Sequence, residues 1–153
     1  MIHVAVFSSI LAATCGYALW RGGAPERAAA IFFAVGFLAT YALPFDKASS
    51  FHRVERGNLL VDLAMLVALL AISLRANRFW PMWVAAVQLL AVAIHGVKAY
   101  DPTLVAWLYN VASGKISYPM VAMLAIGVAR HRERITAYGS DPDWSPWHRE
   151  AFT

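Results

Sequence analysis

Several polar and charged residues of this chain lie within long apolar segments or at their ends. They are Asp62, Gln88, His95, Lys98 and Lys115. An unpaired charge in a hydrocarbon environment costs at least about 2.5 to 3.5 kcal/mol, so such residues usually pair with one another or line a cavity. The sequence therefore predicts that Asp62 pairs with His95, Lys98 or Lys115.

Gln88 and His95 are expected on one face of a helix, because they are seven positions apart. Histidine titrates near neutral pH, so His95 can serve as a proton carrier, a ligand to haem or a metal, or a donor to a quinone or pigment. Purely structural roles stay open. They are a hydrogen bond from His95 to a neighbouring helix, an ion pair for Asp62, and extension of Lys115 to the membrane surface.

Motifs of well-known catalytic or cofactor sites are missing from the sequence. It has no P-loop, HExxH, GxSxG, CxxC or dinucleotide-binding fingerprint. The candidate metal ligands are His3, His52, Asp62 and His95. None of them has the spacing that a metal site on a single helix would use. No catalytic residue, metal ion or required cofactor is predicted, although a membrane-embedded enzyme acting on lipid stays open.

The composition indicates which elements must position these residues. The chain has 153 residues, of which 60% are hydrophobic and 14% are charged, and its mean hydropathy is +0.55. A soluble domain carries roughly a quarter charged residues, so the chain has too few to cover a globule in water. The same apolar excess excludes disorder. An all-α bundle of membrane-spanning helices is predicted.

Five apolar runs have about the length that a helix needs to cross a bilayer. The predicted spans are about 2–20, 28–44, 59–74, 79–97 and either 103–129 or 113–129. In the shorter version of the last span, residues 103–112 form a separate interfacial helix. In both versions Pro119 lies inside the span, where it is expected to kink the helix and free the backbone carbonyl of Lys115.

The basic residues predict an orientation, because their transfer across the membrane is disfavoured. One set of connections holds eight: Arg21, Arg27, Arg75, Arg78, Arg130, Arg132, Arg134 and Arg149. The other set holds four: Lys47, Arg53, Arg56 and Lys98. The N-terminus is therefore expected outside and the C-terminus in the cytoplasm. The expected location is the inner membrane of a bacterial cell. The polar residues of the spans then lie in the outer half of the bundle.

The predicted cytoplasmic tail, 131–153, is unusually aromatic for a disordered segment. Trp144, Trp147 and Phe152 are expected to contact either the membrane interface or a partner protein. His131 is expected in the cytoplasm and not within the bundle.

Three functions are compatible with these features. The first is an accessory, assembly or structural subunit of a larger membrane complex or of a homo-oligomer. The second is a small transporter or ion pathway with Asp62 as the titrating carboxylate. The third is binding of a lipid, quinone or pigment beside Gln88 and His95. Expected partners are membrane lipids and a membrane protein or a second copy. Nucleic-acid binding is not expected.

Overall fold

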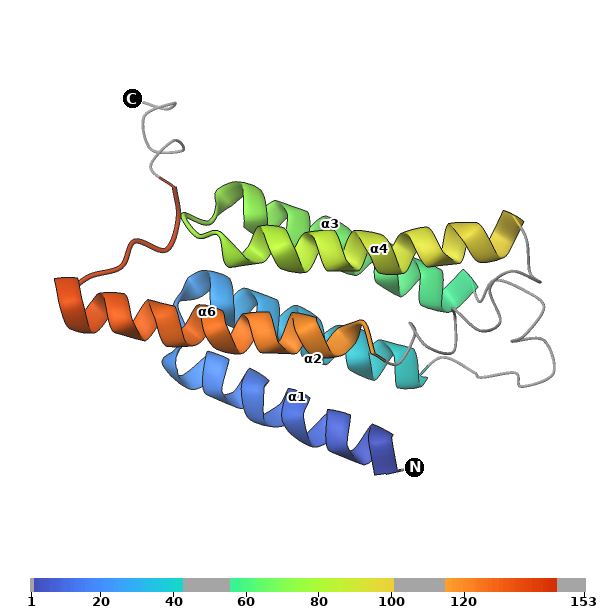
Figure 1. The fold of residues 1–153 in the computed structure, drawn as a ribbon, viewed down its shortest axis with the longest axis horizontal. Coiled ribbons are helices and arrows are strands. Elements are labelled where there is room, and N and C mark those ends of the chain that lie inside the picture. The colour runs from blue at the N-terminus through green and yellow to red at the C-terminus, as the bar shows by residue number, and fades with distance from the viewer. Residues whose placement is uncertain (1, 43–55, 101–114, 146–153) are drawn as a thin grey trace.

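The chain folds into a bundle of α-helices (Figure 1). The computed structural model describes residues 2–42, 56–100 and 115–145, and the side chains of residues 2, 56 and 98–100 lie outside this description. The helices are α1 (Ile2–Arg21), α2 (Ala24–Ala42), α3 (Arg56–Arg75), α4 (Trp80–Tyr100) and α6 (Ser117–Tyr138). The described residues form no strand beyond one isolated β-bridge. The predicted all-α class is confirmed.

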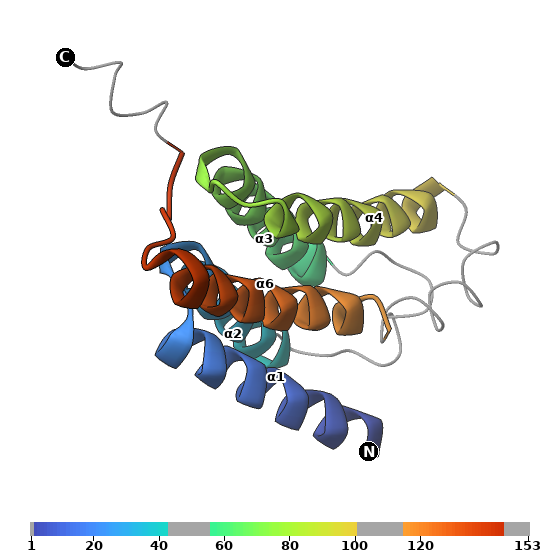
Figure 2. The same ribbon diagram turned by 60° about the vertical axis from the view of Figure 1, so that its left-hand side comes forward.

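Consecutive helices run in opposite directions along the bundle (Figures 1 and 2). Each of the helices α1 to α4 packs against the next one in the sequence. Helix α6 packs against α1, α2 and α4. One end of the bundle therefore holds the beginnings of α1, α3 and α6 with the ends of α2 and α4. The last described residues lie at the opposite end.

Three of the helices are long and apolar enough to cross a membrane: α1, α3 and α4. Helices α2 and α6 have similar lengths, 19 and 22 residues, but each carries charged residues near one end. Large apolar side chains such as Leu38, Leu74 and Ile126 are exposed on the outer faces. Exposure on this scale is unfavourable in water and normal in lipid. These features indicate a membrane protein.

The start of α2 differs from the predicted span. The helix begins at Ala24, with Pro25 and Glu26 in its first turn. Proline fits there because its missing N–H would lack a helical partner anyway, and an acidic residue interacts favourably with the helix dipole. Pro81 has the equivalent place in α4.

The expected kink at Pro119 is wrong. Helix α6 begins at Ser117 after a turn at Lys115 and Ile116, so Pro119 lies in the first turn. The carbonyl of Lys115 accepts a hydrogen bond from the backbone N–H of Tyr118 at 3.2 Å. A single helix over 103–129 is therefore not present, and the expected interfacial helix at 103–112 lies outside the described residues.

Helix α6 also continues beyond the predicted span. Residues 130–138 are helical, and the helix ends at Gly139, whose φ of 75° is left-handed. The N–H of Gly139 caps the helix by bonding to the carbonyl of Ile135 at 2.9 Å. Glycine adopts this conformation at little cost because it has no Cβ.

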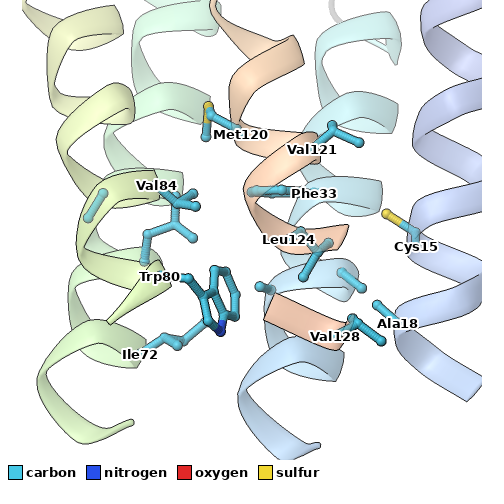
Figure 3. Packing of buried hydrophobic residues seen from close by; sticks show 14 of the residues in the cluster. Cys15, Ala18, Phe33, Ile72, Trp80, Val84, Met120, Val121, Leu124 and Val128 are labelled. Atoms are coloured by element: carbon cyan, nitrogen blue, oxygen red, sulfur yellow. The ribbon is translucent and has the colours of Figure 1, made fainter. Parts of the chain in front are cut away.

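A buried apolar core joins the helices in the middle of the bundle (Figure 3). Leu69, Val84, Leu124 and Val128 are fully buried. The indole of Trp80 packs against Gly127, where an added Cβ would lie only 2.8 to 2.9 Å from three ring atoms. Glycine at this position therefore sets the approach of α4 and α6.

We expect Gly127→Ala to lower the free energy of unfolding by about 1 to 3 kcal/mol, because the methyl group overlaps the Trp80 ring. Gly96→Ala is the matched control, since an added Cβ there meets no described atom within 4 Å. Alanine should leave stability unchanged or raise it by about 0.5 to 1 kcal/mol at that helical position. Unfolding of both variants in mixed micelles measures the difference. Equal stability of the two variants would contradict the packing at Gly127.

Candidate functional site

Three of the polar residues predicted from the sequence lie together between α3 and α4. Gln88 Nε2 donates to Asp62 Oδ1 and to the Asp62 carbonyl, each at 3.0 Å. His95 Nε2 lies 2.9 Å from Asp62 Oδ2. Both carboxylate oxygens are therefore engaged, and the expected pairing of Asp62 with His95 is present. We call Asp62, Gln88 and His95 the Asp62 cluster.

The periodicity of the helices explains this cluster. Gln88 and His95 project from one face of α4, two turns apart, toward the first part of the antiparallel α3. Both are buried, whereas the Asp62 side chain is 30% exposed. The carboxylate is thus held by two buried neighbours while one side stays accessible.

Two adjoining cavities meet at the Asp62 cluster. The larger has a volume of about 690 Å³ and is lined by residues of all the described helices, and the smaller has about 200 Å³. Asp62 and Gln88 line both. Much of the larger wall is apolar, including Phe7, Phe33 and Phe37. Its volume lies within the range of about 300 to 1,000 Å³ usual for small-molecule sites.

The two predicted lysines have different outcomes. Lys115 is exposed and lines the larger cavity. Among the described ion pairs, none joins Lys115 to Asp62. The side chain of Lys98 lies outside the described residues. The structure therefore brings Lys115 to the same cavity as the Asp62 cluster without a direct bond.

The opposite end of the bundle holds a buried group of charged residues that the sequence analysis missed. Its centre is Arg78, whose side chain is 1% exposed. Arg78 Nη1 lies 2.5 Å from Glu26 Oε1, and Nη2 lies 2.9 Å from Asp141 Oδ2 and 3.0 Å from Asp143 Oδ1. We call this group the Arg78 cluster. Its members are Glu26, Arg78, His131, Arg134, Asp141 and Asp143.

His131 is buried within the Arg78 cluster, which corrects its expected place outside the bundle. His131 Nδ1 lies 2.6 Å from Asp141 Oδ2, and Arg134 Nε donates to Asp141 Oδ1 at 2.9 Å. Burial raises the pKa of Asp141, but these hydrogen bonds and the nearby charge of Arg78 outweigh it and hold the pKa below 3.8. The Asp141 carboxylate is therefore ionised at neutral pH.

The segment after α6 docks on the connection between α3 and α4. Trp144 forms an antiparallel β-bridge with Ala76, and Ser145 N–H donates to the Arg75 carbonyl at 2.8 Å. The Trp144 side chain is 41% exposed. Part of the predicted tail thus contacts the bundle through its backbone, whereas Trp147 and Phe152 lie outside the described residues.

The Arg78 cluster left only weak signals in the sequence. The consecutive glycines Gly22 and Gly23 are the clearest one. A Cβ at Gly23 would overlap Asp143 Oδ1 and lie 3.0 Å from both Arg78 Nη2 and His131 Cε1. The turn between α1 and α2 leaves room for the Arg78 cluster because Gly23 has no side chain.

Comparison of the chain with known protein families, with curated proteins and with solved structures finds no match.

We expect Arg78→Gln to lower the free energy of unfolding by about 3 to 5 kcal/mol, because Glu26 would stay buried without its counter-charge and Asp141 would lose one of its two arginine partners. Arg75→Gln is the matched control, since Arg75 is exposed and only three positions away. Its effect should stay within about 0.5 kcal/mol. Unfolding of both variants in the same detergent measures the difference. A similar effect of the two substitutions would contradict the central role of Arg78.

The lowered pKa of Asp141 predicts an acid dependence of stability. The contribution of the Asp141 carboxylate to the free energy of unfolding should be complete above about pH 3.8. It should decrease as the pH falls toward the lower pKa of the folded state, because the unfolded chain binds the proton first. The difference in unfolding free energy between wild type and Asp141→Asn should shrink over this range. Glu133→Gln, which removes an exposed carboxylate of α6, is expected to keep the wild-type profile. A constant difference down to pH 2 would contradict the interpretation.

Proposed function

We propose that this protein is a multi-pass membrane protein that binds an amphiphile of the lipid or quinone class in the cavity beside the Asp62 cluster. The observation that carries the proposal is the combination of a mainly apolar cavity of about 690 Å³ with one hydrogen-bonded carboxylate on its wall. Concave, mostly apolar sites with a few convergent polar groups are the usual form of small-molecule sites.

The apolar wall fits an acyl or isoprenoid chain. Phe7 and Phe37 pack at a centroid distance of 6.1 Å, and Phe7 meets Tyr118 edge to face at 5.1 Å. Phe33 and Met65 extend the same wall. Burial of a chain against these side chains would supply most of the affinity, because aromatic and thioether groups offer large contact areas.

The polar part of the wall fits a headgroup that exchanges hydrogen bonds. Asp62 is partly exposed to the cavity, and Gln88 and Lys115 line it as well. Because His95 contacts Asp62, a headgroup that binds the carboxylate is held next to the imidazole as well. The role proposed for the cluster is to orient the headgroup.

The proposed topology has five crossings in a cytoplasmic membrane, with the N-terminus outside and the C-terminus inside. The alternating directions of the helices support it, as does the excess of basic residues in the connections at the Arg78 end. The cavity then lies in the outer half of the membrane. The tail segment lies at the cytoplasmic surface.

A transport pathway has less support. The Asp62 cluster and the Arg78 cluster lie at opposite ends of the bundle, and fully buried apolar side chains occupy the space between them. Gln88 of the Asp62 cluster and Trp80, which bonds to Glu26 of the Arg78 cluster, are about 12 Å apart along α4. Within the described residues, no polar side chain of the buried core bridges this layer.

An accessory subunit is the second candidate function. The observation that favours it is the indole of Trp144, which stays 41% exposed although its backbone is docked. Aromatic side chains presented on a fixed backbone are common at protein interfaces. Recovery of a protein in fixed ratio with the wild type, and its loss with Trp144→Ala, would favour this function.

The cavity proposal is tested with a matched pair of substitutions on α1. Val4 lines the cavity and is 50% exposed, whereas Val6 is 47% exposed and is not part of the wall. Val4→Trp should fill the cavity and weaken binding of decylubiquinone at least tenfold, or about 1.4 kcal/mol. Val6→Trp should bind as the wild type does. Titration in lipid nanodiscs and mass spectrometry of co-purified lipids provide the two measurements.

Two results would contradict the proposal. One is a wild-type chain that neither retains a co-purified amphiphile nor binds decylubiquinone. The other is equal binding by the two valine variants, which would place the ligand outside the cavity.

A further inference from the structure

Three residues of the Arg78 cluster offer metal-ligating atoms within a small volume. Glu26 on α2, His131 on α6 and Asp143 after α6 each have one such atom, and these atoms lie within 4.8 Å of one another. The three residues come from distant parts of the sequence. This set does not include the metal candidates considered from spacing alone.

Glu26 has an unused oxygen in a fully buried position. Its Oε1 accepts hydrogen bonds from Arg78 at 2.5 Å and from Trp80 Nε1 at 2.9 Å. Its Oε2 is buried and has no hydrogen-bond partner within the part of the chain that the structure describes. A buried carboxylate oxygen without a partner is rare because its desolvation is not compensated. It is thus a candidate ligand for a cation.

His131 has the contact with a carboxylate that is typical of metal-binding histidines. Nδ1 lies 2.6 Å from Asp141 Oδ2, and because an ionised carboxylate only accepts hydrogen bonds, Nδ1 is the nitrogen that donates. The lone pair of Nε2 then remains for a metal. Histidine ligands usually hold their other nitrogen against a carboxylate in this manner.

The charges of the cluster favour one more cation. Three carboxylates, those of Glu26, Asp141 and Asp143, face two guanidinium groups, those of Arg78 and Arg134. With a neutral imidazole, the cluster carries one negative charge in excess. The excess carboxylate attracts a cation, and the attraction is strongest where water is partly excluded.

From these observations we infer that the cluster is a binding site for a divalent cation of the Zn²⁺ class. The ligands are Glu26 Oε2, His131 Nε2 and a carboxylate oxygen of Asp143. Zinc binds nitrogen and oxygen at about 2.0 to 2.2 Å, which places tetrahedral ligands about 3.4 Å apart. One ligand atom from each residue lies within 4.8 Å of those of the other two, so those atoms would need to approach by at most about 1.4 Å.

The surroundings of the ligands fit this assignment. Arg78 and Trp80 hold the other oxygen of Glu26, and Arg78 also contacts Asp143 Oδ1. The Cα of Gly23 lies so close that a Cβ would overlap Asp143 Oδ1. A metal there would tie the segment after α6 to the first turn of α2.

The test uses the full chain in lipid nanodiscs, treated with a chelator and then titrated with Zn²⁺, with Co²⁺ as a spectroscopic probe. One Zn²⁺ per chain is expected, together with a higher melting temperature that the chelator reverses. His131→Gln and Asp143→Asn should each weaken binding at least tenfold. Glu133→Gln and His3→Gln are matched controls on exposed side chains and should bind as the wild type does.

Asp143→Asn keeps the test valid if His131→Gln fails to fold, because the Asp143 side chain is 38% exposed. The inference is overturned if the folded wild type binds no Zn²⁺ in stoichiometric amount. It is also overturned if Asp143→Asn binds with unchanged affinity. A protonated His131 in ¹⁵N spectra of a zinc-treated wild-type chain would show that a proton supplies the missing charge, which overturns it as well.

Discussion

The arrangement of the bundle at one end depends on the burial of the Arg78 guanidinium. A buried charge is costly unless an opposite charge compensates it, so Arg78 requires carboxylates from elsewhere in the chain. Glu26 supplies one from the first turn of α2, and Asp141 and Asp143 supply two from the segment after α6. One side chain thus fixes the helix start, the connection between α3 and α4 and the docked segment relative to one another.

Trp80 links this electrostatic group to the apolar core. Its indole N–H donates to Glu26, and its ring packs on Gly127 in the space that a methyl group would take. The same side chain therefore satisfies a buried acceptor and sets the distance between α4 and α6. The Asp62 cluster, at the other end, is held by fewer elements and borders open cavities. The bundle is thus tightly packed around Trp80 at one end and has accessible polar groups at the other.

Much of the helical fold and of the Asp62 cluster was predictable because both depend on short-range patterns. Apolar runs of about 20 residues indicated the helices, and the predicted segments overlap those observed at α1, α3 and α4. The spacing of Gln88 and His95 placed them on one face, and the short connection before α4 brings that face against Asp62. The kink at Pro119 was wrong because the start of α6, which the apolar run does not mark, decides whether a proline lies in a first turn.

The sequence by itself determined the apolar surroundings of this protein, its helical class and the placement of Gln88 and His95 on one helix face, since hydrophobicity and helical period are local properties of the chain. It left three candidate partners for Asp62, and the tertiary structure selected His95. Only the tertiary structure decided the Arg78 cluster and the cavity. Glu26, His131 and Asp143 belong to segments that share no periodicity, and their charges looked like those of solvated helix ends. These residues lie close together only when the helices pack side by side. Packing across the whole bundle therefore decides which carboxylates contact the buried guanidinium of Arg78.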